Sequence, residues 1–262
     1  MKINLIYKKP KKIKADYPIV LLDKFIAKET CENLCKEIKN FSNFDDLVMN
    51  GRYRVNKGSE TFSKSLSSSP YLSELYKSLN NLKTYKKMEK ILKKNNLKSN
   101  FSANTKNLSF SKDSYGQQKF NFFDYFRKTK IISSFFKPKI NLDMDFSKSK
   151  RGYFRQAHRD RDTRVISFLI YLNNISKKDG GQFEVYKSKK NYRDPKLYKR
   201  FPENNTVLKI NKFPPVSGQM FVFLSTPNSY HGVSKFLSKK KERIFIYGSY
   251  SLDRNVQWDL NR

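Results

Sequence analysis

The stretch Gly152-Tyr-Phe-Arg-Gln-Ala-His158-Arg-Asp160, with the run Arg164-Val-Ile-Ser-Phe-Leu-Ile-Tyr171 that follows it, decides the fold. The second run is rich in β-branched and aromatic residues, which predicts a buried strand. In an extended segment, His158 and Asp160 project from the same face, because side chains alternate along a strand. Asp162 is in phase with both, but the His-x-Asp spacing favours Asp160 as the partner of His158.

Further short strands are expected around this stretch. From about Pro138 onwards, apolar runs alternate with turn residues and span 140–146, 165–172, 182–186, 220–224 and 244–250. The turns are marked by Gly180-Gly181, Pro214-Pro215 and Gly218. Several short strands at this spacing predict an all-β barrel or jelly roll.

The second histidine stands in Ser229-Tyr-His231-Gly-Val233, after the strand expected at 220–224. A sheet folded back on itself would bring His231 beside His158 and Asp160. Two imidazoles and one carboxylate are the ligand set of non-haem Fe(II) oxygenases. A His-x-Asp triplet is weak by itself, and a satisfied or surface imidazole is the alternative for each histidine taken singly.

The order of motifs over residues 140–252 resembles the 2-oxoglutarate and Fe(II)-dependent dioxygenases, and within them the prolyl-hydroxylase-like branch. The motifs are the His-x-Asp stretch, Tyr171-Leu-Asn173, Gly180-Gly181-Gln-Phe-Glu-Val-Tyr186, Pro215-Val-Ser-Gly218, His231-Gly-Val233 and Arg243. The resemblance implies an α+β fold, with a double-stranded β-helix (jelly-roll) core and N-terminal supporting helices. It also implies Fe(II) held by His158, Asp160 and His231, with 2-oxoglutarate and dioxygen as cosubstrates.

The resemblance also implies a site for the cosubstrate. Arg243 falls where the family's basic residue binds the distal carboxylate of 2-oxoglutarate, and a guanidinium offers a planar fork that matches a carboxylate. Tyr171 falls where the branch often has a tyrosine hydroxyl assisting the same carboxylate, and core packing is the alternative. Two positions depart from the family pattern: Phe146 stands where many relatives have a tyrosine close to the metal, and Phe245 where some have a serine.

The first part of the chain predicts a strand followed by helices. Tyr17-Pro-Ile-Val-Leu-Leu-Asp23 predicts a buried strand, and apolar residues recur at helical spacing in 31–38, 71–79 and 82–92. Cys31 and Cys35 share one helix face without nearby ligand partners, which favours packing over a redox or metal role. The outer lysines of 82–94 indicate either a solvated face or an anion-binding surface.

Two stretches of the first part match no motif. Residues 41–70 are polar and serine-rich, and residues 95–118 predict a long loop or insertion, followed by an aromatic cluster in 120–136. We expect two regions, a strand with supporting helices and a basic insertion in 1–139, and the dioxygenase core in 140–255.

The chain of 262 residues carries a net charge of +32, and this charge is spread along its length. Such a charge fits a nucleic-acid surface, but a codon bias that enriches Lys, Asn, Ile and Phe together explains it as well. No apolar run approaches the length of a membrane helix, and the start lacks the apolar stretch of a signal peptide. We therefore expect a cytoplasmic protein with no membrane partner.

The activity that the resemblance implies is hydroxylation of an unactivated carbon, with a prolyl residue or a small molecule as the substrate. Because halogenases of this kind leave the carboxylate position vacant for chloride, Asp160 argues for hydroxylation. Two alternatives stay open: a basic, non-catalytic jelly roll that binds nucleic acid, and an oxygenase that acts on nucleic-acid bases. The arginines around the His-x-Asp stretch either attract an anionic substrate or point into solvent.

Overall fold

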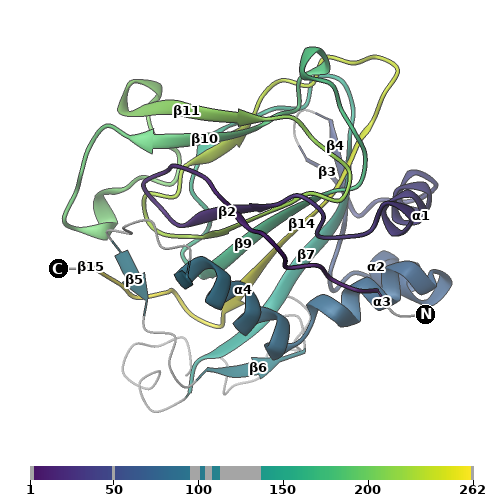
Figure 1. Ribbon diagram of the computed structural model, residues 1–262, viewed down its shortest axis with the longest axis horizontal. Helices are drawn as coiled ribbons and strands as arrows, with labels where there is room; N and C mark the ends of the chain where they lie inside the picture. The colour runs from purple at the N-terminus through teal and green to yellow at the C-terminus, as the bar shows by residue number, and fades with distance from the viewer. Residues whose placement is uncertain (1–2, 49–50, 95–100, 104–107, 113–136, 261–262) are drawn as a thin grey trace.

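The computed structural model describes residues 3–48, 51–94, 101–103, 108–112 and 137–260. Within these residues the core consists of two antiparallel sheets, and the helices lie together on one side of the larger sheet (Figure 1). This arrangement is the predicted α+β fold with a jelly-roll core. None of the helices in the described ranges is long and apolar enough to cross a membrane.

The larger sheet joins strands from both halves of the chain. Its order is β1-β2-β12-β9-β14-β7-β4-β3, and β6 pairs with β7 in parallel. The strands are β1 (Lys11–Lys12), β2 (Ile19–Leu22), β3 (Asp46–Val48), β4 (Arg52–Asn56), β6 (Ser109–Ser111), β7 (Lys139–Ser149), β9 (Arg164–Tyr171), β12 (Met220–Leu224) and β14 (Arg243–Leu252). The N-terminal strands β2 and β4 thus flank the C-terminal ones.

The smaller sheet has the order β11-β10-β13-β8. Its strands are β8 (Arg155–His158), β10 (Phe183–Ser188), β11 (Val207–Phe213) and β13 (His231–Val233). A separate pair joins β5 (Phe101–Ala103) to β15 (Trp258–Leu260). The smaller sheet carries both histidines, each at the end of a short strand.

Four helices are formed within the described ranges: α1 (Lys28–Lys39), α2 (Glu60–Ser68), α3 (Pro70–Leu79) and α4 (Leu82–Lys94). Ser59 caps α2 and Ser69 caps α3, each accepting a hydrogen bond from a backbone N–H three residues on. Pro70 then occupies the first turn of α3, where its missing N–H costs nothing. The predicted helices at 31–38, 71–79 and 82–92 are confirmed.

Strict alternation along the strands of the larger sheet creates two separate cores. In β9, Ile166, Phe168 and Ile170 pack towards the helices, whereas Leu169 and Tyr171 pack towards the smaller sheet. The same alternation continues in β12 and β14. Because both faces are buried, these strands are mostly apolar, which explains the long apolar runs in the sequence.

Cys31 and Cys35 belong to the core between α1 and the larger sheet. Both are free, and burial raises the pKa of the Cys31 thiol to about 11. A protonated, buried thiol is unreactive, so the structure agrees with a packing role. The lysines of α4 that the sequence places outside, Lys83 and Lys86 among them, are exposed.

Part of the first half is more regular than the sequence indicates. Residues 41–70, expected to be irregular up to a helix entry, hold β3, β4 and the whole of α2, and residues 95–118 hold β5 and β6. The aromatic cluster expected in 120–136 lies outside the described residues. Helices α1, α3 and α4 share one apolar core with β7, β9, β12 and β14, and the expected boundary near 139 stays a prediction.

Candidate active site

The two histidines meet on neighbouring strands of the smaller sheet. Strand β13 pairs with β8 in a register that sets His231 directly opposite His158, with their ring centroids 4.4 Å apart. Asp160 follows β8, which ends at His158 and not beyond Asp160 as the sequence suggested. One donor atom from each of the three residues lies within 4.8 Å of the others, and all three residues are buried.

Each imidazole is held in the tautomer that a metal ligand needs. His158 Nδ1 lies 3.0 Å from the Gln156 carbonyl oxygen, and His231 Nδ1 lies 3.0 Å from the Ser229 carbonyl oxygen. A carbonyl only accepts, so each Nδ1 carries the proton and each Nε2 offers a lone pair. Within the described part of the chain, His231 Nε2 is buried without a hydrogen-bond partner. The donor set and this unpartnered nitrogen therefore fit a divalent metal ion.

Asp160 is held by three side chains from β9 and β14. Its Oδ1 accepts from Arg164 Nη1 at 2.7 Å, its Oδ2 accepts from Ser167 Oγ at 2.6 Å, and the Tyr247 hydroxyl lies 2.7 and 2.8 Å from the two oxygens. Burial alone would raise the pKa of Asp160, but the Arg164 guanidinium beside it outweighs this effect and holds the pKa of Asp160 well below its usual range. The carboxylate is thus ionised and fixed in orientation.

The surroundings of the histidines keep both rings neutral. Burial lowers the pKa of His231 and, together with the neighbouring His231, lowers the pKa of His158 well below its ordinary value. The rings of Phe223 and Phe183 lie 4.7 and 5.9 Å from the His231 ring, which limits access of water. A neutral imidazole is the form that binds a metal.

Arg243 lies between the same two sheets and is fully buried. Its Nη2 donates to the Tyr171 hydroxyl at 3.1 Å, while its Nε and Nη1 have no hydrogen-bond partner among the described residues. The Phe245 ring lies 4.0 Å from the guanidinium carbon. A buried guanidinium with two open donors is costly unless a ligand completes it, and a carboxylate matches its geometry.

Because Gly181 has no side chain, it leaves room for the side chain of Arg243. A Cβ at this glycine would lie 3.0 Å from Arg243 Cδ and 3.2 Å from the Phe236 ring, and its φ of +66° is one that other residues rarely adopt. The Gly180-Gly181 turn in the sequence is therefore part of the site.

Two predicted features are settled by the structure. Asp162 is exposed and pairs with Arg159, so it lies away from the histidine pair. Phe146, which stands where many relatives have a tyrosine close to the metal, points to the helix side and stacks on Phe62, with ring centroids 4.9 Å apart. Phe245, by contrast, does face the interior beside Arg243.

The sequence reasoning missed three polar residues of the site, Arg52, Ser167 and Tyr247. It named Arg164 only among the arginines that either attract an anionic substrate or point into solvent, and not as a partner of Asp160. Arg52 of β4 binds Asp145 at 2.6 Å, and its guanidinium lies over the rings of Phe245 and Tyr247. Tyr247 could have been found, because it is in phase with Arg243 and Phe245 along β14. Arg52 and Ser167 had no comparable signal in the sequence.

A double-stranded β-helix that buries a His-x-Asp pair, a second histidine and an open arginine defines the class of Fe(II)- and 2-oxoglutarate-dependent oxygenases. Residues 144–250 match the family model described as the 2OG-Fe(II) oxygenase superfamily. The predicted enzyme class, a dioxygenase that uses Fe(II), 2-oxoglutarate and dioxygen, is confirmed at this level.

Solved structures with a similar fold come from several organisms. A prolyl-4-hydroxylase from Pseudomonas putida is 16% identical, with 90% of this chain and 92% of that chain covered and a TM-score of 0.44. HygX from Streptomyces hygroscopicus, solved with nickel and 2-oxoglutarate, is 11% identical, with 90% and 83% covered and a TM-score of 0.47. Structural similarity at this level of sequence identity and TM-score does not identify the substrate. A search of curated proteins finds no match to this chain.

Proposed function

We propose that this protein is an Fe(II)- and 2-oxoglutarate-dependent hydroxylase in which His158, Asp160 and His231 hold the metal. The observation that carries the proposal is the buried Nε2 of His231, which has no hydrogen-bond partner among the residues that the structure describes. His231 lies opposite His158, and its Nε2 is 4.0 Å from Asp160 Oδ1. Both imidazoles have their protons fixed on Nδ1, so the three donors converge without further rearrangement of tautomers.

Bound Fe(II) supplies the activation of dioxygen, with 2-oxoglutarate converted to succinate and carbon dioxide while one oxygen atom enters a C–H bond of the substrate. The side chains of the protein hold and orient the reactants. Arg164, Ser167 and Tyr247 fix both oxygens of Asp160 and keep it ionised. Because Asp160 supplies a carboxylate ligand, hydroxylation is favoured over halogenation.

Arg243 and Tyr171 are proposed to bind the distal carboxylate of 2-oxoglutarate. Two of the guanidinium nitrogens point into the interior without partners among the described residues, and Tyr171 already holds the third. The metal centre and Arg243 are joined by a chain of contacting aromatic rings, from His231 through Phe183 and Phe221 to Tyr171. A dicarboxylate spanning this apolar interior would therefore meet the metal ion at one end and the guanidinium donors of Arg243 at the other.

The substrate is proposed to be a prolyl residue of a peptide or a small molecule, in line with the prolyl-hydroxylase-like order of the motifs. The other candidate, an oxygenase that acts on nucleic-acid bases, shares this site and would differ only in what the entrance admits. Binding of Fe(II) distinguishes both from a non-catalytic nucleic-acid-binding jelly roll.

The test compares Asp160→Ala with Asp162→Ala, which removes the same side chain two residues away on an exposed position. Binding of Mn(II), a redox-stable substitute, is measured by its electron paramagnetic resonance signal, and succinate formation is measured with Fe(II), 2-oxoglutarate and air. We expect wild type and Asp162→Ala to bind Mn(II) and form succinate, and Asp160→Ala to lose both. Equal behaviour of the two variants would contradict the assignment.

A further inference from the structure

We infer that the substrate is an acidic peptide, whose carboxylates are held by a guanidinium cluster, Arg155, Arg161 and Arg200, beside the metal centre. The inference rests on the proposed function, because it names the substrate class of the same site. It goes beyond the motifs of the fold, since the three arginines belong to the strand β8, the turn after it and a loop that is distant in sequence.

The cluster lies against the metal ligands themselves. The ring of Phe201 stacks on His158 with centroids 6.3 Å apart and an interplanar angle of 22°. The guanidinium carbons of Arg155 and Arg200 lie 5.3 and 5.2 Å from the centre of the same ring. Phe201 is 43% exposed although it touches a buried ligand, so the ring marks the side from which the site is reached.

Hydrogen bonds fix the loop that carries Arg200 to the ligand strand. The Arg159 backbone N–H donates to the Arg200 carbonyl at 2.9 Å, and Arg159 Nε donates to the Tyr198 carbonyl at 2.8 Å. Arg200 is thus held beside the metal centre by the residue between His158 and Asp160.

The cluster lacks the anions that balance its neighbours. Arg159 pairs with Asp162 and Arg164 with Asp160, whereas Arg155, Arg161 and Arg200 form no ion pair within the described ranges. Burial lowers the pKa of Arg200, and so do the positive charges of Arg161, Arg155 and Arg164. Like charges crowded in this way repel, and an anionic ligand relieves the repulsion.

Background composition does not explain the cluster. Lysines outnumber arginines about three to one in the whole chain, yet the segment from Arg151 to Arg164 contains five arginines and no lysine. Guanidinium is the group that binds carboxylates in a bidentate manner and stacks on aromatic rings. The basic residues at the site therefore differ in kind from the diffuse lysine charge.

The arrangement favours a peptide over a nucleic acid. Single strands of nucleic acid are bound along a track of aromatic rings on which successive bases stack. Here the guanidinium groups of Arg155 and Arg200 already pack on one exposed ring, Phe201. A compact group of guanidinium groups around one apolar ring can bind the carboxylates of a short acidic peptide while one residue of that peptide lies at the metal.

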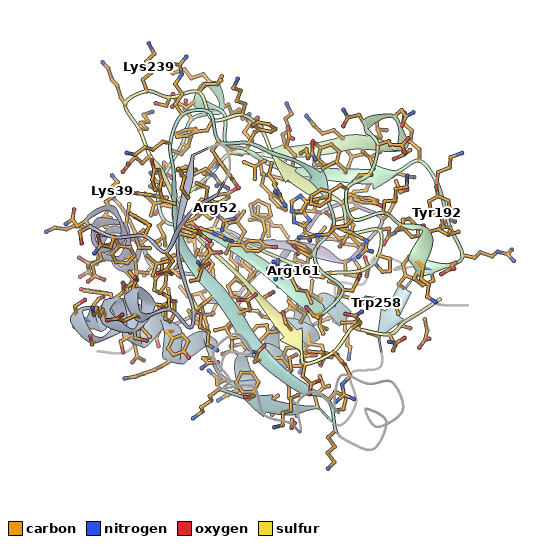
Figure 2. The ribbon with its side chains drawn as sticks, turned by 180° about the vertical axis from the view of Figure 1, so that it is seen from behind. Lys39, Arg52, Arg161, Tyr192, Lys239 and Trp258 are labelled. Carbon is orange, nitrogen blue, oxygen red and sulfur yellow. The ribbon has the colours of Figure 1, made fainter. Side chains whose placement is uncertain are left out.

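The test measures binding of a fluorescein-labelled oligoglutamate peptide with a central proline by fluorescence anisotropy, using the full chain loaded with Mn(II) and 2-oxoglutarate. The double variant Arg155→Gln/Arg200→Gln is compared with Lys239→Gln/Lys240→Gln, which removes the same charge from exposed lysines. Figure 2 shows Arg161 towards the middle of the face seen from behind and Lys239 at its outer edge. Mn(II) binding, measured separately, reports on the proposed metal site.

We expect the arginine variant to bind the peptide at least ~10-fold more weakly, the lysine variant to change by less than about 2-fold, and Mn(II) binding to be kept in both. Equal weakening by both variants, or no saturable binding by wild type, would overturn the inference. An oligothymidylate of equal charge is tested in the same way. If it binds more tightly than the peptide, and the arginine variant weakens this binding, the assignment of an acidic peptide is overturned in favour of a nucleic acid. If wild type does not bind Mn(II), the proposed metal site is contradicted, and this failure is distinguishable from a failure of the arginine cluster to bind the peptide.

Discussion

Arg243 has the most unusual setting of any charged residue among those described. It is fully buried, packed against Phe245 and Tyr171, and left with two open donors. A buried charge without a counter-ion among the described residues is strongly destabilising, so an anionic ligand best explains the presence of Arg243. The same reasoning applies to His231 Nε2, and together they outline a site with a metal at one end and a carboxylate at the other.

Replacing Arg243 by lysine should raise the KM for 2-oxoglutarate by about 10- to 100-fold, because a point charge replaces a bidentate fork. Tyr171→Phe should raise the same KM by only a few-fold, since it removes one hydroxyl. Succinate formation at varied 2-oxoglutarate gives both values, and Arg193→Lys, on an exposed loop, is the control. An unchanged KM in Arg243→Lys would rule out this residue as the carboxylate anchor.

Tyr247→Phe should weaken Mn(II) binding by about 10-fold while leaving the fold intact, because the lost hydroxyl contacts both oxygens of Asp160. Circular dichroism checks the fold, and Mn(II) titration checks the affinity. Tyr53→Phe, a half-buried tyrosine on strand β4, is the matched control. If Tyr247→Phe binds Mn(II) like wild type, the tyrosine has no part in orienting the carboxylate.

The site residues differ in how well the sequence predicts them. His158, Asp160 and His231 could be named because they stand in an ordered series of motifs over residues 140–252, although the His-x-Asp triplet is weak by itself. Arg164, Ser167 and Tyr247 act through Asp160, and the contact between Tyr247 and Asp160 joins positions 87 residues apart. A single sequence does not reveal which distant strands become neighbours, so such supporting contacts appear only in the structure.

Among the elements, the turn before β10 affects the site most directly. Gly180 and Gly181 both have positive φ, and the missing Cβ of Gly181 leaves room for Arg243. Gly152 has a positive φ of +96° but nothing within 4 Å of its Cβ position, so it provides a natural comparison. Backbone strain and crowding of Arg243 can therefore be separated.

Gly181→Ala and Gly152→Ala should each lose about 1 kcal/mol of stability, because both force a non-glycine residue into a positive φ. Only Gly181→Ala should also raise the KM for 2-oxoglutarate, since its new methyl group displaces the Arg243 side chain. Denaturant unfolding and succinate kinetics measure the two effects. A similar rise of KM in Gly152→Ala would mean that the effect comes from strain and not from contact.

The elements were predicted best where burial is complete. Strands β2, β9 and β12 are apolar because both faces are covered, and α1, α3 and α4 show clear helical periodicity. Strand β4 reads Arg-Tyr-Arg-Val-Asn with only Val55 buried, and β11 is largely exposed, so neither gives an apolar run. Helix α2 is serine-rich, which favours a loop by propensity, and it is kept by its Ser59 cap and by Phe62 packing.

On the scale of the whole molecule, the N-terminal half completes the catalytic core. Strand β2 pairs with β12, β4 pairs with β7, and Arg52 of β4 packs over Phe245 and Tyr247 inside the site. The core on the helix side also draws residues from both halves. The family match alone, residues 144–250, thus covers the chemistry but not the full fold.

A chain shortened to residues 140–255 should not fold, because it exposes the edges of β12 and β7 and the apolar face that the helices cover. We expect poor solubility and no cooperative thermal transition by circular dichroism, with the full chain as the control. A soluble fragment that melts cooperatively and binds Mn(II) would instead support an independent domain from 140 onwards.

The central claim, that His158, Asp160 and His231 bind Fe(II) beside 2-oxoglutarate, is tested most directly by absorption spectroscopy. Under anaerobic conditions, Fe(II) and 2-oxoglutarate are added to the purified protein, and the visible range is scanned for the metal-to-ligand charge-transfer band. We predict a band in wild type and in Asp162→Ala, and no band in His231→Ala. Absence of the band in wild type, or its persistence in His231→Ala, would contradict the account.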